Sequence, residues 1–297
     1  MLLVLLLRLV GNLLRVVFFP LVLLRRHRAS PKDGWVPLEL DGAVLEMAPP
    51  RSFLPWAPRP TGMPLQRLRE LVTAMLEDPR PAGLLVTVRS FSASPAPRTA
   101  IAAELARLRA GKKRVVVHLP FGGSTPELAL VAAADRVLLG ATTTLGPLGF
   151  RSIAVYLRRA LDDVGLVPDV HAEGAYKTAG EPISLDEMSL AQAEQVGRLL
   201  DVFSDELVSA LVSGRGMTRE AAVALLDRGL VSAADAVPLG LVDAVVHDDE
   251  AVHVLDGERT EHPARTVSAG SYLRRRKATV LRRVLPPRAV AVVELHG

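Results

Sequence analysis

The chain has 297 residues, of which 49% are hydrophobic, and it carries a formal net charge of only +4. A chain of this length and apolar content can bury a complete core, which excludes a disordered tail. The absence of cysteine excludes a disulfide framework and thiolate metal sites, and the 4% of aromatic residues argues against stacking on nucleic acid bases.

The first 28 residues predict a membrane anchor. Residues 1–24 are almost wholly apolar and precede a basic cluster at 25–28. Arg8, Asn12 and Arg15 interrupt this run at helical spacing, and each central arginine costs roughly 2.5–3.5 kcal/mol in a spanning helix. A spanning helix and an interfacial one, with its leucine-rich face down, therefore both remain open. The basic cluster favours the cytoplasmic side for that end, which conflicts with an exported catalytic domain, so the topology also stays open.

The next region, residues 29–83, is expected to lead into the core. It begins with a strand at 35–40 and continues through a proline-rich stretch at 49–64. An amphipathic helix follows, because apolar residues recur at helical spacing. These residues are Leu65, Leu68, Leu71 and Met75.

From residue 84 onward, short apolar runs alternate with segments of helical periodicity. Strands are expected at 84–88, 115–119, 137–139 and 169–172, and helices at 98–110, 127–134 and 152–164. Strands separated by crossover helices imply parallel βαβ units with both sheet faces covered.

A long helix is expected next, since Ser189 and Gln192 form a capping box and an apolar stripe continues to Leu211. A shorter helix at 219–227 follows. Residues 248–287 are polar and then strongly basic, which suits a linker. Residues 290–297 echo residues 35–42, so we interpret 288–297 as the start of a second repeat.

Lys177 is the most informative residue for chemistry. Arginine supplies 31 of the 36 basic residues, so each lysine is a rare choice. A desolvated lysine can lose its proton and act as a general base, which arginine cannot do. Lys177 lies in a segment of small residues after a predicted strand. On composition alone, an exposed loop lysine remains the simpler interpretation.

The segment around Lys177 resembles the general-base motif of the signal peptide peptidase A (protease IV) family, in which this lysine deprotonates a serine. Further stretches similar to the family's pattern extend the resemblance from about residue 84 to residue 246. The matching residues are Gly174, Tyr176, Lys177, Ala179, Glu181 and Pro182, then the stretches 186–189 and 215–218, then Asp235, Gly240 and Asp243. The resemblance implies an α/β fold, a Clp protease/crotonase-like spiral of βαβ units with an N-terminal membrane-associated helix.

The same resemblance places the nucleophile position at Thr125, with Ser124 beside it. In the family, this residue is a serine followed by two glycines, whereas Pro126 and Glu127 follow Thr125 here. We therefore expect no active nucleophile in this turn, and we interpret Ser124 and Thr125 as a helix N-cap. The stretch 90–95, which corresponds to the family's oxyanion-stabilising turn, contains no glycine. An oxyanion hole is accordingly not expected in this half.

Five segments result from this interpretation. They are a membrane anchor at 1–28, a leading strand and helix at 29–83, a Clp/crotonase-like peptidase domain at 84–247, a basic linker at 248–287 and the start of a second repeat at 288–297. Double-length members of the family carry the lysine in the first repeat and the serine in the second. The chain resembles such a first half.

The function implied is that of a membrane-associated serine endopeptidase, or its first half, which cleaves signal peptides or other membrane-released peptides through a Ser/Lys dyad. Lys177 is the expected general base, and the nucleophile is expected from a second repeat or another copy. The expected partners are peptide substrates and the membrane, with no nucleic acid, cofactor or metal. The expected location is the bacterial cytoplasmic membrane, facing the extracytoplasmic side.

Two other functions compete with this one. A catalytically silent membrane scaffold, or a regulatory half of such a protease, is favoured if Lys177 is exposed, whereas a buried Lys177 favours the enzyme. A crotonase-type acyl-coenzyme A enzyme shares the fold but is expected to lack the Tyr176–Lys177 pair.

Overall fold

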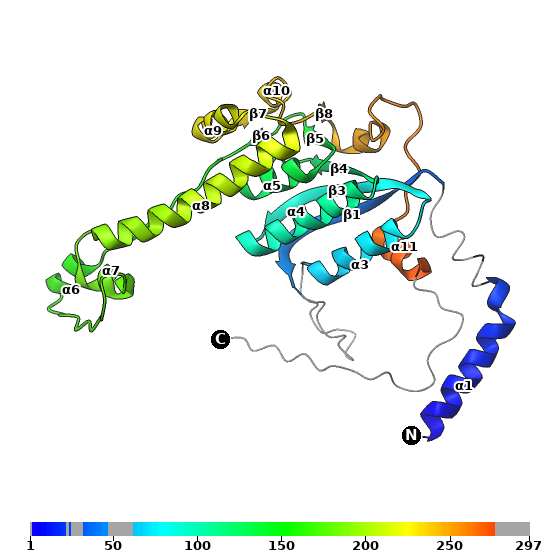
Figure 1. Cartoon of the computed structure of the whole chain (residues 1–297), viewed down its shortest axis with the longest axis horizontal. Helices are drawn as coiled ribbons and strands as arrows, with labels where there is room; N and C mark the ends of the chain where they lie inside the picture. The colour runs from blue at the N-terminus through cyan, green and yellow to red at the C-terminus, as the bar shows by residue number, and fades with distance from the viewer. Residues whose placement is uncertain (1, 22–23, 25–31, 47–61, 277–297) are drawn as a thin grey trace.

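The computed structural model describes residues 2–21, 24, 32–46 and 62–276. Its centre is a six-stranded sheet in the order β2-β1-β3-β4-β5-β8, and every neighbouring pair is parallel (Figure 1). The strands are β1 (Gly34–Leu45), β2 (Met63–Pro64), β3 (Pro81–Ser92), β4 (Arg114–Leu119), β5 (Arg136–Gly140) and β8 (Ala244–Val246). The parallel α/β fold is confirmed, as are the four strands expected before residue 140.

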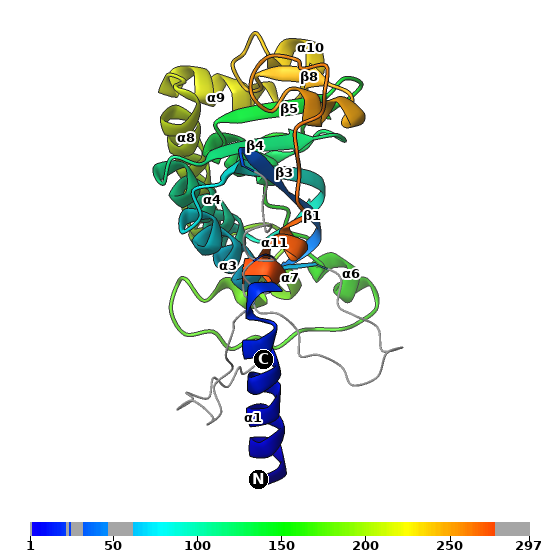
Figure 2. The ribbon, with the colours of Figure 1, turned by 90° about the vertical axis from the view of Figure 1, so that its right-hand side faces the viewer.

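The described residues also form helices, of which three, at 65–76, 95–110 and 125–133, pack on the sheet. They are α1 (Leu2–Val17), α3 (Leu65–Leu76), α4 (Pro95–Ala110), α5 (Thr125–Ala133), α6 (Arg158–Asp163), α7 (Glu181–Ser184), α8 (Leu190–Arg215), α9 (Arg219–Arg228), α10 (Ala233–Ala236) and α11 (Ala269–Arg276). Two short 3₁₀ helices are η1 (Thr178–Gly180) and η2 (Asp248–His253), and β6 (Thr144–Leu145) and β7 (Val231–Ser232) form a separate antiparallel pair. Figure 2 shows α3, α4 and α8 together on one side of the strands.

The main core lies between the sheet and the layer of α3, α4 and α5. The amphipathic helix expected from Leu65, Leu68, Leu71 and Met75 is confirmed as α3, and all four side chains are buried. Full burial of one such side chain contributes roughly 1.5–3 kcal/mol relative to exposure. The central strands are apolar on both faces, as a parallel sheet that is covered on both sides requires.

The opposite face of the sheet is covered by the segment after β8. A second apolar cluster joins Trp35 and Val116 of the strands to Ala251, Val254 and Leu255. This segment was expected to form part of a linker, but its apolar residues at 251, 254 and 255 are buried on the sheet.

A buried polar cluster fastens α11 to the end of α3. Tyr272 is fully buried, and its hydroxyl donates to the carbonyl oxygen of Ala74 at 3.0 Å. Asp78 accepts from Nε and Nη2 of Arg80 at 2.9 and 2.8 Å. Burial alone would raise the pKa of Asp78, but the hydrogen bonds and charge of Arg80 hold it below its ordinary value. The structure therefore differs from the expected linker over 248–276, while 277–287 and the expected second repeat at 288–297 lie outside the described residues.

Only the C-terminal part of helix α8 packs against the sheet domain. Its C-terminal part packs on α5 and buries Leu207, Val208 and Leu211. Gly214 permits this close packing, because a Cβ there would lie 1.9 Å from the carbonyl oxygen of Ala132. The N-terminal part extends away from the sheet and carries α6, η1 and α7 at its far end (Figure 1). We call residues 151–202 the arm.

Two predictions within the arm were wrong. Of the helix expected at 152–164, only α6 forms. The chain just before α6 is instead held within the arm by a hydrogen bond from the Leu157 N–H to the carbonyl oxygen of Pro182. The strand expected at 169–172 is absent, since these residues lie in the arm, where the structure assigns no neighbouring strand. The long helix itself is confirmed as α8, and the Ser189 hydroxyl accepts from the Gln192 N–H at 3.1 Å.

His118 of β4 is an ionisable side chain within the second face of the sheet. It is 1% exposed, its Nδ1 lies 3.7 Å from Oδ1 of Asp248, and its Nε2 has no hydrogen-bond partner among the described residues. Asp248 in turn pairs with Arg89 at 3.3 Å. Burial lowers the pKa of His118 below 6.5, and the nearby Arg89 acts in the same direction, while Asp248 opposes it.

We predict that stability falls on acidification because of His118. The folded state disfavours the imidazolium, so the free energy of unfolding is undiminished above pH 6.5 and declines as the pH falls from 6.5 towards the lower folded-state pKa. The slope is at most about 1.4 kcal/mol per pH unit. Urea unfolding between pH 5 and pH 8 measures it. His118→Gln should flatten this part of the profile, and an equally steep decline in that variant would contradict the assignment.

Candidate active site

The turn that corresponds to the family's nucleophile position opens onto a hollow of about 680 Å³. The hollow lies between the start of α5, the segment 147–151, the middle of α8 and the end of α9. Its lining includes Thr125, Leu148, Phe150, Leu200, Ser204 and Leu226. A concave site of this volume can accept several side chains of a peptide.

Thr125 lies at the first position of α5 and is 7% exposed. Its hydroxyl donates to the carbonyl oxygen of Gly149 at 2.8 Å, with the carbonyl oxygen of Pro147 at 3.3 Å. A carbonyl oxygen accepts this hydrogen bond but does not remove the proton, so it cannot activate the hydroxyl as a nucleophile. In this chain Thr125 fastens the 147–149 segment to α5.

Ser124 is the N-cap of α5, as the sequence predicts. The carboxylate of Glu127 accepts from the Ser124 N–H at 2.8 Å and from its hydroxyl at 3.2 Å. This is the N3 half of a capping box, which satisfies a backbone donor at the helix start. Glu127 itself is 7% exposed, so this capping interaction is buried.

The two glycines before Ser124 serve chain packing. Gly122 has a φ of +80°, and a Cβ there would lie 2.1 Å from the carbonyl oxygen of Thr144. Gly123 donates to that same oxygen at 3.3 Å and accepts from the Gly146 N–H at 2.7 Å. Thr144 and Leu145 form strand β6, and Leu145 bridges to Gly123 of the nucleophile-equivalent turn.

The stretch at 90–95, which contains no glycine, is divided between β3 and the start of α4. Its first residues belong to β3, and Ser94 is the N-cap of α4. The Ser90 hydroxyl donates to Asp41 at 2.7 Å and accepts from the Gly42 N–H at 2.9 Å, which ties β3 to β1.

Lys177 lies on the arm, at the start of η1, and its side chain is exposed. Its backbone N–H closes a turn onto the carbonyl oxygen of Gly174 at 3.1 Å, where φ is +97°. Within the described part of the chain, the Lys177 side chain makes no hydrogen bond or ion pair. The structure therefore presents this amine outward rather than enclosing it.

The backbone around Lys177 is braced against α8. Gln195 donates to the carbonyl oxygen of Tyr176 at 2.8 Å, and the Tyr176 hydroxyl donates to Glu194 at 2.9 Å. Glu181, four residues after Lys177, accepts from the Ser189 hydroxyl at 2.7 Å at the start of α8. The sequence had suggested Gln192 as the reciprocal partner of Ser189, so the role of Glu181 was missed.

The structure does not bring Lys177 and Thr125 together. Gln195, which holds the lysine loop, precedes Ser204 at the Thr125 hollow by nine residues of α8, a rise of about 14 Å. Figure 1 shows the same separation, with α7 and α5 at different ends of the arm helix. Two side chains that exchange a proton must lie within hydrogen-bond reach. These two residues of one copy therefore do not form a dyad in this conformation.

Comparison with known proteins identifies the family. The sequence profile of the family described as Peptidase family S49 matches residues 107–260, just over half of the chain. The chain belongs to peptidase family S49. This is a serine peptidase family, and the resemblance to signal peptide peptidase A is confirmed by a curated relative, the chloroplastic serine protease SPPA of Arabidopsis thaliana. The two are 23% identical over 195 residues, which cover 66% of this chain but only 29% of the relative's length.

Solved structures similar to this S49 chain come from two groups of proteins. A membrane-bound stomatin-specific protease, in a mutant form, is 8% identical with a TM-score of 0.45, covering 80% of this chain and 97% of that one. An enoyl-CoA hydratase/isomerase family member is 14% identical with a TM-score of 0.41, covering 74% and 69%. A monofunctional enoyl CoA isomerase from M. smegmatis is 15% identical with a TM-score of 0.36, covering 63% and 65%.

We predict that Thr125 contributes to stability. Thr125→Val keeps the shape of the side chain but removes the bond to Gly149, which should lower the free energy of unfolding by about 1 kcal/mol. Thr142→Val at an exposed position is the matched control and should change it by less than about 0.5 kcal/mol. Chemical denaturation measures both. Equal effects of the two substitutions would show that the hydrogen bond of the Thr125 hydroxyl does not contribute to the free energy of unfolding.

Proposed function

We propose that this chain is the lysine-bearing half of a membrane-associated serine endopeptidase that cleaves signal peptides or other membrane-released peptides. Lys177 is the general base of a Ser/Lys dyad, and the serine comes from a second repeat or another copy of the chain. Two observations support the proposal: the chain belongs to a serine peptidase family, and Lys177 lies on a braced arm, at the other end of α8 from its own nucleophile-equivalent turn.

In this reaction the Lys177 amine takes the proton of the incoming serine hydroxyl as the serine oxygen attacks the peptide carbonyl carbon. The resulting ammonium returns the proton to the leaving amine, and an acyl-serine ester remains. Lys177 then takes a proton from water, whose oxygen attacks the ester. As the ester bond breaks, the ammonium gives this proton to the serine oxygen, which releases the peptide acid and restores the serine hydroxyl and the neutral amine. The dyad supplies both nucleophile and base, so the proposal needs no metal or cofactor.

The surface of the arm supports a missing partner. Large apolar side chains are exposed along it, and a patch of this kind marks an interaction surface. They include Ile153 at 71%, Val155 at 66%, Val164 at 68%, Val167 at 77% and Leu190 at 91% exposed. A partner that covers them would also desolvate Lys177, which favours the neutral amine that a general base requires. A second repeat or a second copy of the chain fits this role.

The N-terminal helix supports attachment to a membrane. Exposed apolar side chains surround the described part of α1, including Leu13 at 68% and Val17 at 67%. No helix among the described residues is both long enough and apolar enough to cross a bilayer. We propose that α1 lies in the membrane interface, with the basic cluster at 25–28 beside the headgroups. The bacterial cytoplasmic membrane, with the catalytic part on the extracytoplasmic side, is the proposed location.

A catalytically silent membrane scaffold is the second candidate function. The exposure of Lys177 and the structural role of Thr125 favour it, because neither group is set up for catalysis within one copy. The two functions differ in what the assembled protein does. The scaffold would order a partner without needing the amine of Lys177, whereas the protease requires that amine.

We predict that Lys177→Arg inactivates the assembled protease as fully as Lys177→Ala. A guanidinium keeps its proton and cannot accept that of the serine, and loss of a positioned base typically costs about 10²–10⁴-fold in rate. The measurement is hydrolysis of a peptide ester by the chain supplied together with a nucleophile-bearing second repeat. The chain without that repeat should give no turnover.

The control is Lys112→Arg, which changes another exposed lysine in the turn after α4 and should leave the rate unchanged. Lys177→Met should fold normally, because it keeps the apolar stem. Near-normal hydrolysis by Lys177→Arg would leave the scaffold as the better function. Hydrolysis by the chain alone that Thr125→Ala or Ser124→Ala abolished would overturn the divided site.

We also predict that the first 28 residues hold the protein at membranes. Vesicles of phosphatidylethanolamine and phosphatidylglycerol should sediment the full chain in high salt but not a chain that lacks residues 1–28. Leu13→Gln with Phe18→Gln should weaken sedimentation at least about tenfold, because both side chains are exposed on the apolar helix. Leu230→Gln, at an exposed position in the body, is the control. Undiminished sedimentation after the deletion would refute the anchor.

A further inference from the structure

Within residues 32–46 and 62–276, which the structure describes, one edge of β1 is unpaired over most of its length. On its inner edge β1 pairs with β3 from Gly34 to Ala43. On its outer edge it pairs with β2 only at Val44 and Leu45, and with the isolated bridge at Thr266 only through Trp35. Between these points, residues 36–43 have no strand neighbour on the outer side within the described chain.

The backbone groups on this open edge can be assigned from Trp35. Its N–H donates to Arg265 at 2.8 Å and its carbonyl accepts from Val267 at 3.0 Å, so both groups face the outer edge. Alternate residues of a strand face the same edge, which places Pro37 and Glu39 outward. The register of β1 and β3 shifts between Leu40 and Asp41, but the Gly42 N–H still donates to Ser90 of β3, which leaves Asp41 outward. Pro37 has no N–H, so the pairing with 265–267 cannot continue past it. The free groups are the N–H of Glu39 and of Asp41 and the carbonyls of all three residues.

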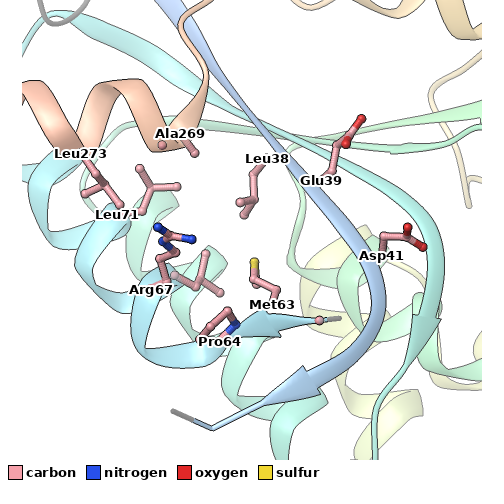
Figure 3. A pocket seen from close by; sticks show the side chains of 12 residues that line it. Leu38, Glu39, Asp41, Met63, Pro64, Arg67, Leu71, Ala269 and Leu273 are labelled. Atoms are coloured by element: carbon pink, nitrogen blue, oxygen red, sulfur yellow. The ribbon is translucent and has the colours of Figure 1, made fainter. Parts of the chain in front are cut away.

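A groove of about 410 Å³ runs beside this edge. Figure 3 shows Leu38, Met63, Leu71 and Leu273 lining it from β1, β2, α3 and α11. Glu39 and Asp41 also line the groove, and their side chains extend to the other side of β1 (Figure 3). A strand added to the edge would therefore meet, on one face, a largely apolar surface that also carries Arg67. On the other face it would meet two carboxylates, of which Glu39 lies 3.5 Å from Arg89.

We infer that the open edge of β1 binds an extended peptide segment in which apolar and basic residues alternate. The peptide backbone would pair with the free groups of Pro37, Glu39 and Asp41, as in recognition by strand addition. Because successive side chains of a strand point to opposite faces, the apolar residues would enter the groove and the basic ones would lie by Glu39 and Asp41. Eight open residues leave room for a peptide of about six residues, at about 3.3 Å per residue.

Charge decides between this partner and a second copy of the chain. Pairing two copies edge to edge would bring Glu39 and Asp41 towards the same carboxylates of the other copy, and like charges across a strand pair are destabilising. On that face the carboxylates of Glu39, Asp41 and Asp248 outnumber the guanidinium of Arg89, which pairs with Glu39 and Asp248, so a basic peptide meets a net negative charge. This surface is also separate from the Thr125 hollow, because the two share no lining residue. The inference therefore stands independently of the proposed protease function.

The probe is a fluorescently labelled, capped hexapeptide of three Val-Lys repeats, titrated into the full chain. We expect saturable binding with a dissociation constant below about 1 mM. Hydrogen exchange should slow at the amides of Glu39 and Asp41. The matching peptide of three Val-Glu repeats should bind at least about tenfold more weakly. Absence of saturable binding by the lysine peptide, or equal binding of the two, would overturn the inference.

Two further peptides test the backbone pairing without changing the protein. One carries N-methyl groups on every valine amide and the other on every lysine amide, so each blocks one edge of the peptide strand. Only the edge that faces β1 matters, so one peptide should lose at least about tenfold in affinity and the other should bind nearly as the parent does. Equal binding of both would mean that no strand is added.

Protein variants then locate the site. The double variant Glu39→Lys with Asp41→Lys should weaken binding of the lysine peptide at least about tenfold, whereas Glu258→Lys, an exposed charge reversal elsewhere, should not. Glu39→Pro removes an outward N–H and should weaken binding more than Glu39→Gln, which removes only the charge. Circular dichroism confirms folding of each variant. Unchanged binding by the folded double variant would place the peptide elsewhere and refute the proposal.

Discussion

Gly214 lets the backbone of α8 lie directly against Ala132, near the end of α5, where any Cβ would come within 1.9 Å of a carbonyl oxygen. Interiors packed at this density are not deformed without cost, so the contact fixes the direction of α8 relative to α5. Since α5 begins at the Ser124–Thr125 turn, the same contact sets the distance between that turn and the lysine loop. The division of the active site proposed here depends on that geometry.

The outer half of α8 gains little from its own copy. The buried side chains of the helix are Leu207, Val208 and Leu211, all in its C-terminal part, while Leu199 and Val202 are about half exposed. A helix whose apolar residues face solvent over several turns is stabilised by a partner or remains marginal. The braces from Gln195, Glu194 and Glu181 hold the lysine loop to α8, but they bury almost no apolar surface. The arm thus holds the Lys177 loop firmly but leaves the apolar surface around that loop exposed.

The predictions from the sequence were most accurate where apolar periodicity coincides with burial of the side chains. The strands before residue 140 and helix α3 follow from runs whose side chains are all buried, so local pattern and tertiary packing agree. The predictions for residues 152–172 were wrong, because these residues belong to the arm and not to the sheet. An apolar run there has no neighbouring strand with which to pair. The predictions were also wrong after β8, where spaced apolar residues such as Val254 and Tyr272 are hidden among charges that suggested a linker.

The candidate site divides in the same way. The N-cap role of Ser124 could be predicted, because serine three residues before glutamate is a local signal. The exposure of Lys177 agrees with the simpler interpretation from composition, but its position on the arm could not be predicted, since it depends on the direction of a helix that begins a dozen residues later. The bond between Thr125 and Gly149 joins residues on different segments, and only the folded chain brings them together.

Glu127 makes the present turn hard to reverse in evolution. Its carboxylate closes the N-terminus of α5 through Ser124, and replacing it by glycine would remove a cap worth about 0.5–2 kcal/mol. Recovering the serine–glycine–glycine sequence requires changes at Thr125, Pro126 and Glu127 together, and each glycine placed in the first turn costs roughly 1 kcal/mol of helix propensity. Thr125→Ser alone would restore the serine but not the two glycines after it, and the glycine changes lower the stability of α5. Under the proposed division of the active site, this turn therefore serves folding of α5, and the nucleophile is left to a second repeat or copy.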